Sequence, residues 1–255
     1  MTICFYTICD SQLQKGLPNS RNLDFAGFVN SFRRFHPGIE LKIFDQNDMS
    51  TQGVNYYNAK AVFGRILSEK YDLVVNIDSD HYCMQRFDEI LAADYDVACP
   101  ANFNETDNLV GIKVSSGITG EANKCWLVDE VNFLQGGIIA SPNKEFWRHF
   151  EYATQQHYQK FHCYENDVLN LVAYLYPYKV KVLDGNCDYR DPAHNCWYGC
   201  SIINKEPKAY IENDKIMLEG KPIKAYHFAH GSAKRKYSDI FSPEVSEFIK
   251  TNIIC

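Results

Sequence analysis

The sequence predicts an α/β fold in which helices flank a central mixed, mostly parallel sheet. Patterns typical of strands and helices alternate through the first hundred residues in the order β-α-β-α-β, which favours parallel strands joined by crossover helices. With 255 residues and 45% hydrophobic content, the chain can bury a sizeable core as one large domain or as two joined lobes. Ligands of such sheets bind beyond the carboxyl ends of the strands, so the residues that follow each strand are the first site candidates.

Hydrophobic periodicity defines each element of the first half. The helix over residues 25–35 carries apolar side chains at helical spacing and stops at His36-Pro37-Gly38. The expected elements in chain order are a strand over 3–8, that helix, a strand over 39–44, a helix over 58–68 and a strand that starts at Leu73. The polar residues at the carboxyl ends of these strands are Tyr6, Thr7, Asp45, Asp78 and Asp80.

The pattern weakens between residues 101 and 130, and we expect a loop there that contacts an acceptor substrate. Regular structure is expected again as a strand over 131–140, helices over 144–159 and 167–176, and strands over 180–183 and 223–228. Gly136-Gly137 interrupts the first of these strands, which indicates either the close approach of a ligand or backbone, or a plain bulge.

Asp78-Ser79-Asp80 is the most informative motif, because it places two carboxylates one residue apart at the end of an apolar strand. Side chains alternate across a strand, so Asp78 and Asp80 are expected to face the same way and to hold Mg²⁺ or Mn²⁺. An Asp-x-Asp pattern arises by chance about once in a chain of this length. The second copy, Asp94-Tyr95-Asp96, precedes a strand and is interpreted as a solvated turn. The first copy predicts an enzyme that handles a nucleotide diphosphate.

Composition argues against several classes of protein. The formal charge is −6 and the longest basic run is Lys234-Arg235-Lys236, so nucleic acid is not expected as a partner. No apolar run approaches the roughly 18 residues of a transmembrane segment, and the N-terminus lacks a signal-peptide pattern. The ten cysteines contain no Cys-x-x-Cys pair, so we expect mostly buried free thiols and a cytoplasmic location. A weaker alternative is a zinc site formed by Cys187, His194, Cys196 and Cys200.

Five motifs together resemble the GT-A glycosyltransferases, most closely family 8, the type of glycogenin and bacterial lipopolysaccharide galactosyltransferases. They are His36-Pro37, Lys60, Asp78-Ser79-Asp80, the strand Phe133-Leu134-Gln135-Gly136-Gly137-Ile138, and the helix start Glu165-Asn166-Asp167-Val168-Leu169-Asn170. The similarity covers nearly the whole chain and is weakest in residues 101–130 and 186–222. It implies a single GT-A domain of Rossmann-like type, with a nucleotide-sugar-binding half in residues 1–100 and an acceptor-binding half in residues 101–255.

The resemblance implies a further metal ligand in the C-terminal tail, where the family has His-x-x-Gly-x-x-Lys. Its histidine binds the metal and its lysine binds the diphosphate. Here the first histidine, His227, stands one residue too far from Gly231. Both His227 and His230 are therefore candidates, and His230 is slightly favoured because it directly precedes the glycine. Gly231 and Lys234 are expected on the donor diphosphate.

The strand ends and the resemblance together give the remaining donor contacts. Asp78 and Asp80 are expected to hold Mn²⁺ or Mg²⁺. The nucleotide and diphosphate contacts are expected from Tyr6, Thr7, Asp45, Lys60 and Ser79, and the donor-sugar pocket from Gln135, Gly136, Gly137, Glu165, Asn166 and Asp167. The family places Glu165 on the sugar hydroxyls and Asn166 beneath the anomeric carbon. The alternatives are a core position for Tyr6, a solvated helix position for Lys60, and helix capping by residues 165–167.

The expected activity is metal-dependent transfer of a hexose, glucose or galactose, from a UDP-sugar to a hydroxyl of a glycan or glycoconjugate, with retention of configuration. Acceptor contacts are expected from residues 101–130 and from Tyr189, Trp197 and Tyr198. A sugar-phosphate nucleotidyltransferase is less consistent, because residues 8–15 lack a Gly-rich basic loop. A noncatalytic glycan-binding protein of the same fold is the third interpretation. The sequence does not indicate an oligomeric state.

Overall fold

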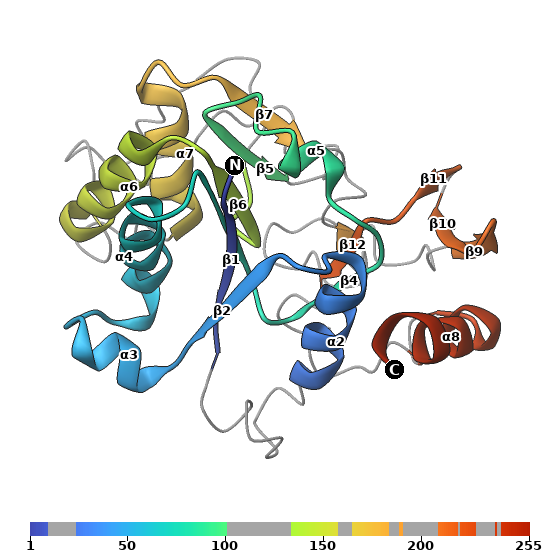
Figure 1. Ribbon diagram of the computed structural model, residues 1–255. Coiled ribbons are helices and arrows are strands. Elements are labelled where there is room, and N and C mark those ends of the chain that lie inside the picture. The colour runs from blue at the N-terminus through green and yellow to red at the C-terminus, as the bar shows by residue number, and fades with distance from the viewer. Residues whose placement is uncertain are drawn as a thin grey trace, which may run out of the picture. The chain divides into compact units, whose positions relative to one another are not determined.

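The computed structural model describes residues 1–9, 24–100, 134–157, 165–183, 189–190, 209–218, 220–227, 238 and 241–255 (Figure 1). The chain divides into two compact units. The first unit comprises Met1–Ile8, Glu40–Ile77 and Asp88–Asp184, and the second comprises Cys9–Ile39, Asp78–Phe87 and Gly185–Cys255. Predicted features in residues 101–130 and 186–188, and the proposed zinc ligands, lie outside the described residues.

The first unit is built on a six-stranded sheet with the order β2-β1-β3-β6-β5-β7. Its strands are β1 (Ile3–Ile8), β2 (Glu40–Phe44), β3 (Leu73–Ile77), β5 (Val97–Pro100), β6 (Ile138–Ser141) and β7 (Val180–Leu183). All neighbours are parallel except β6, which runs antiparallel to both β3 and β5. This mixed, mostly parallel sheet confirms the predicted fold class.

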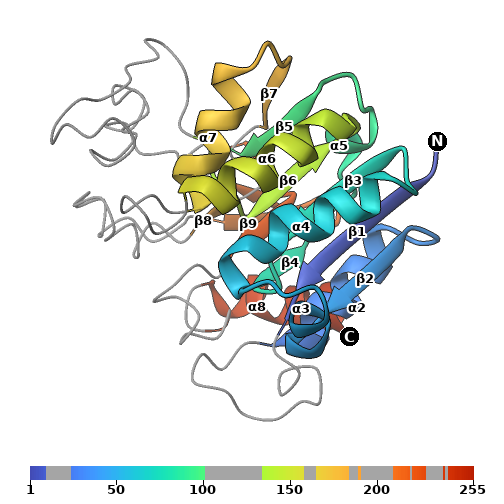
Figure 2. The same cartoon turned by 90° about the vertical axis from the view of Figure 1, so that its left-hand side faces the viewer.

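Helices α4 (Tyr56–Ser68), α6 (Lys144–His157) and α7 (Glu165–Leu175) cover one face of this sheet (Figure 2). Two shorter helices, α3 (Gln46–Thr51) and α5 (Asp88–Leu91), complete the first unit. The core beneath the three long helices contains the fully buried ring of Trp147, whose Nε1 donates to the carbonyl oxygen of Ser141. α4 approaches α6 closely because Gly64 faces this ring.

We expect Gly64→Ala to lower the thermal stability. A Cβ at this position would overlap the Trp147 ring, and overpacking of this kind costs about 1–3 kcal/mol. Helix propensity acts in the opposite direction by about 1 kcal/mol, because alanine is the better helix former. Differential scanning calorimetry decides between the two effects. A melting temperature equal to or above that of the wild type would show that the α4–α6 contact can relax at no cost.

The second unit contains two small sheets, β4-β12-β8 and β9-β10-β11. The elements are α2 (Phe25–Phe35), β4 (His81–Cys83), β8 (Tyr189–Arg190), β9 (Ala209–Glu212), β10 (Lys215–Leu218), β11 (Lys221–Pro222), β12 (Ala225–His227), α8 (Pro243–Ile249) and the π-helical turn η5 (Lys250–Ile254). Asp24 caps α2 by accepting from the N–H of Gly27, and it also accepts from the hydroxyl of Tyr82 in β4. These bonds fix the helix to the strand that follows Asp80.

Part of the secondary structure agrees with the sequence prediction. β1, α2, β7 and the starts of α6 and β3 lie where they were predicted, whereas α3, α5, β4, β9 to β11 and α8 were not predicted. Among the described cysteines, Cys4, Cys9, Cys83 and Cys99 are buried free thiols, and Cys255 is exposed. Within the described residues, no helix is long and apolar enough to cross a membrane.

Candidate functional site

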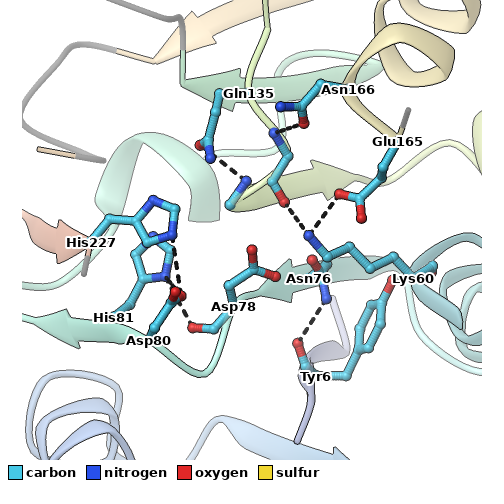
Figure 3. Close-up of polar contacts among 12 residues, drawn as sticks. Tyr6, Lys60, Asn76, Asp78, Asp80, His81, Gln135, Glu165, Asn166 and His227 are labelled. Carbon is cyan, nitrogen blue, oxygen red and sulfur yellow. Dashed lines mark hydrogen bonds and ion pairs between the residues drawn. The ribbon is translucent and has the colours of Figure 1, made fainter. Parts of the chain in front are cut away.

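Lys60 is the centre of a polar cluster in the first unit. Its Nζ donates to Glu165 Oε1 at 2.7 Å and to the carbonyl oxygen of Gly136 at 2.9 Å (Figure 3). The lysine side chain is 8% exposed and the glutamate side chain 20% exposed, so the ion pair is largely withdrawn from water. Lys60 is therefore not the solvated helix lysine that the sequence left open as an alternative. A buried ion pair of this kind stays in place only where its charges are well paired.

The first turns of α7 hold the segment that contains Gly136, which forms a turn before β6 (Ile138–Ser141) and not part of the strand expected over 131–140. Asn166 Oδ1 accepts from the Gly136 N–H at 2.9 Å. Asn170 pairs with the backbone of Leu134 in both directions, donating to its carbonyl oxygen and accepting from its N–H. The Asn170 side chain thus satisfies both backbone groups of Leu134, as a neighbouring strand would. This role was not predicted from the sequence. Local backbone bonds to these asparagines position Gly136 next to Glu165.

We expect Gly136→Ala to reduce any activity that depends on this cluster. A Cβ on residue 136 would lie 2.6 Å from Glu165 Oε1 and 2.9 Å from Asn166 Oδ1, so both side chains would have to move. The stability cost should remain within about 1–3 kcal/mol, since the clash is with side-chain ends. Steady-state kinetics, corrected for the folded fraction, measure the effect. Activity within twofold of the wild type would show that the tight approach at Gly136 has no functional role.

Other residues predicted for the donor-sugar pocket lie in the same segments. Gln135 is buried, and its Oε1 accepts from the N–H of Gly137 at 3.0 Å. Asp167 lies in the first turn of α7 and is partly buried. The structure therefore brings Lys60, Gln135, Gly136, Gly137, Glu165 and Asn166 into one connected network.

The second unit contains a separate group of one carboxylate and two imidazoles. Asp80, His81 and His227 each offer one ligand atom, and these atoms lie within 4.8 Å of one another. Asp80 Oδ1 is 3.2 Å from His227 Nε2 and 3.6 Å from His81 Nδ1 (Figure 3). The two imidazole rings are stacked with centroids 4.0 Å apart. Because oxygen and nitrogen donors converge here, the group fits a divalent cation.

Electrostatics keep Asp80 in its anionic form. Burial alone would raise the pKa of Asp80, but the imidazoles of His227 and His81 outweigh that effect and hold this pKa well below its usual value. Asp80 is therefore ionised at neutral pH. A deprotonated carboxylate is the form that binds a metal ion.

The register of β4 and β12 explains how His81 joins this group. These antiparallel strands place His81 directly opposite His227, and such cross-strand partners have their side chains in contact. His81 was not among the predicted metal ligands, although it immediately follows the Asp78-Ser79-Asp80 motif. The sequence did contain one indication of this role, because His81 is adjacent to the predicted metal ligand Asp80.

Asp78 differs from the sequence expectation. Its carboxylate does not belong to the group formed by Asp80, His81 and His227, and Figure 3 shows it pointing away from Asp80. The prediction that both carboxylates face the same way assumed strand geometry through residue 80. In the structure β3 ends at Ile77 and residues 79–80 form a turn, so alternation no longer applies and that prediction is wrong. The backbone carbonyl of Asp78 instead accepts a hydrogen bond from His81 Nδ1 at 3.0 Å.

Tyr6 and Thr7, at the end of β1, are buried in the first unit. Tyr6 is fully buried, its hydroxyl donates to the carbonyl oxygen of Lys60, and its ring packs edge-on against Phe44 and Trp147. Of the two interpretations left open for Tyr6, the structure shows the core position. Thr7 is also fully buried, and its hydroxyl makes no hydrogen bond within the described part of the chain.

Asp45 caps α3. Its Oδ1 accepts from the N–H groups of Asn47 and Asp48, and the Asp48 side chain accepts in return from the N–H of Asp45. This reciprocal arrangement is a capping box. A nucleotide contact by Asp45 or by Thr7 stays a prediction. Ser79 lies in the turn after β3, whereas His230, Gly231 and Lys234 lie outside the described residues.

Comparison with known proteins supports the fold. No protein-family model and no curated protein sequence matches the chain. Among solved structures, the galactosyltransferase LgtC in complex with donor and acceptor sugar analogues is 11% identical, with a TM-score of 0.55, over 97% of this chain and 95% of that one. Mouse xyloside xylosyltransferase 1 is 11% identical, with a TM-score of 0.52, over 91% and 99%.

A third similar structure is much longer than this chain. The WbbM bifunctional glycosyltransferase is 14% identical, with a TM-score of 0.55, and the match covers 90% of this chain but only 46% of that protein. The chain therefore spans less than half of WbbM. Together these matches show that the chain has the GT-A fold of glycosyltransferases.

Proposed function

We propose that this protein is a metal-dependent glycosyltransferase that moves a hexose, glucose or galactose, from a UDP-sugar to a hydroxyl of a glycan or glycoconjugate. The observation that carries the proposal is the group formed by Asp80, His81 and His227 in a chain with the GT-A fold, with Asp80 in the turn that follows β3. In the complex of LgtC, a chain of this fold holds donor and acceptor sugar analogues. Residues 1–100 are proposed to bind the nucleotide sugar, and residues 101–255 the acceptor.

The group formed by Asp80, His81 and His227 is proposed to bind the metal ion. A Mn²⁺ or Mg²⁺ ion would neutralise the negative charge that develops on the departing diphosphate. Asp80 and His227 would bind that ion, and Asp78 is retained as a candidate ligand on the family resemblance. His230, Gly231 and Lys234 are proposed on the same resemblance for the metal and the diphosphate.

The cluster of the first unit is proposed to bind the transferred sugar. Glu165 would accept hydrogen bonds from sugar hydroxyls, and Lys60 would keep its carboxylate ionised and oriented through their 2.7 Å contact. Gln135, Gly136, Gly137 and Asp167 would line the pocket. Thr7 and Asp45 are proposed for the nucleotide.

We propose transfer with retention, through an oxocarbenium-like state shielded by Glu165 and Asn166. An amide is a poor nucleophile. The oxygen of Asn166 also already accepts from the Gly136 N–H, which favours a positioning role over covalent attack. Proton NMR of the first-formed product tests the stereochemistry. An inverted anomeric centre would refute this part of the proposal.

A screen of nucleotide sugars tests the function itself. We expect slow release of UDP from UDP-glucose or UDP-galactose without any acceptor, in the presence of Mn²⁺ and not in its absence. UDP-N-acetylglucosamine and GDP-mannose serve as controls for sugar and base. Binding of UDP with Mn²⁺ in calorimetry, but no turnover of any donor with a panel of acceptors, would indicate a noncatalytic protein. Pyrophosphate release from UTP and a sugar phosphate would instead indicate a nucleotidyltransferase.

A further inference from the structure

We infer that His81 is a metal ligand, so that the second unit binds its divalent cation through two imidazoles and one carboxylate. This inference adds a ligand to the metal site of the proposed function. It rests on that proposal only in assuming that a cation binds there. It concerns a residue outside the Asp-x-Asp motif and outside the C-terminal tail.

The distances allow one ion to contact all three side chains. Metal–nitrogen and metal–oxygen bonds in proteins are about 2.0–2.2 Å long, so two ligands of one ion can lie up to roughly 4 Å apart. Asp80 Oδ1 is 3.2 Å from His227 Nε2, within that limit, and one ligand atom from each of Asp80, His81 and His227 lies within 4.8 Å of the other two. Small side-chain adjustments would bring these atoms to bonding distance from a common centre.

The surroundings hold His81 in this place. It is fully buried in β4, opposite His227 in β12, and its Nδ1 lies 3.0 Å from the carbonyl oxygen of Asp78. In metal sites such a bond is made by the ring nitrogen that does not bind the metal, so Nδ1 would hold the ring on this carbonyl and Nε2 would be the atom that binds the ion. A purely structural histidine would be satisfied by the same carbonyl, but that role does not require a second imidazole and a carboxylate within 4.8 Å.

A donor set with two imidazoles has a consequence for metal choice. Mg²⁺ prefers an octahedral set of oxygen ligands, whereas Mn²⁺ begins the first-row transition series, in which affinity for mixed nitrogen and oxygen sites rises toward the later ions that imidazole suits best. The site should therefore bind Mn²⁺ in preference to Mg²⁺, and His81 should contribute to that preference. A site with one imidazole would discriminate less.

Pulsed electron paramagnetic resonance of the wild-type protein with Mn²⁺ and UDP tests the inference without any substitution. Incorporation of ¹⁵N-labelled histidine identifies couplings to histidine nitrogen. We expect two directly coordinated histidine nitrogens. A single coordinated nitrogen would overturn the inference and leave the proposed glycosyl transfer intact. Absence of any bound Mn²⁺ would overturn both the inference and the metal part of the proposed function.

His81→Phe provides the second measurement. Phenylalanine keeps a flat apolar ring against His227 but has no ring nitrogen. We expect about a tenfold or larger loss of Mn²⁺ affinity and a clearly smaller loss of Mg²⁺ affinity, both measured by calorimetry. His149→Phe is the matched control, since His149 stacks on Tyr176 in the first unit and is not among the three ligands. An unchanged ratio of Mn²⁺ to Mg²⁺ affinity in a folded His81→Phe protein would contradict the inference.

Discussion

Asp80→Asn should lower metal-dependent turnover of the UDP-sugar on the order of 10³-fold. Asparagine keeps the shape of the side chain but removes the charge that the two imidazoles hold in the ionised form. Loss of one group that stabilises charge in a transition state typically costs 10²–10³-fold, or about 2.7–4 kcal/mol, and Asp80 also anchors the ion itself. Release of UDP, measured across a range of Mn²⁺ concentrations, reports the effect.

Two matched variants make this result specific. Asp94→Asn changes the first carboxylate of the other Asp-x-Asp sequence, which is exposed and pairs with Lys181, and it should leave turnover unchanged. Asp78→Asn tests the carboxylate outside the metal group and should have the smaller effect of the two motif variants. Circular dichroism verifies that each variant is folded. If a folded Asp80→Asn protein retained activity within a few-fold, the metal assignment would be wrong.

Lys60→Met is expected to lower kcat by about 10²-fold with a smaller change in KM. The substitution leaves the largely buried Glu165 carboxylate without its 2.7 Å partner, so that carboxylate is free to reorient or to become protonated. Methionine has similar length and no charge, so it fills a similar space without an ammonium group. Separate measurement of kcat and KM with saturating Mn²⁺ distinguishes this effect from a loss of donor binding.

The double variant Lys60→Met/Glu165→Gln provides a coupling test. If the two side chains act as a unit, it should be about as impaired as the worse single variant. Arg65→Met is the control, because Arg65 lies on the same helix and pairs with Glu151 but does not contact Glu165. Full additivity of the Lys60 and Glu165 effects would show that their contact has no functional role.

The sequence was sufficient for the sheet of the first unit but for only part of the second unit, where it located α2 and β12. β1, β3 and α4 have strong local patterns and bury their apolar residues in one core, so periodicity located them. β4 was missed because three residues are too few for a periodic signal, and its partner β12, which lies within the expected strand over 223–228, is far away in the chain. α3 was missed because only Met49 among its six residues is buried.

The same contrast applies to the candidate site. Lys60, Gly136, Glu165 and Asn166 were named from motif resemblance, and the structure brings them into contact. The role of Asn170 depends on bonds to Leu134, and the position of His81 depends on the β4–β12 register. Local sequence shows only that His81 adjoins the Asp78-Ser79-Asp80 motif; the contacts of both residues arise from pairing between distant segments. Asp78 was misjudged because strand alternation was extended beyond the end of β3.

A crystal structure with Mn²⁺ and UDP, with data collected at an energy that reveals manganese by anomalous scattering, tests the central claim most directly. We expect one anomalous peak within about 2.4 Å of Asp80 and His227, with oxygens of the UDP diphosphate completing its coordination. UDP bound without a metal ion, or a manganese peak away from Asp80 and His227, would contradict the account.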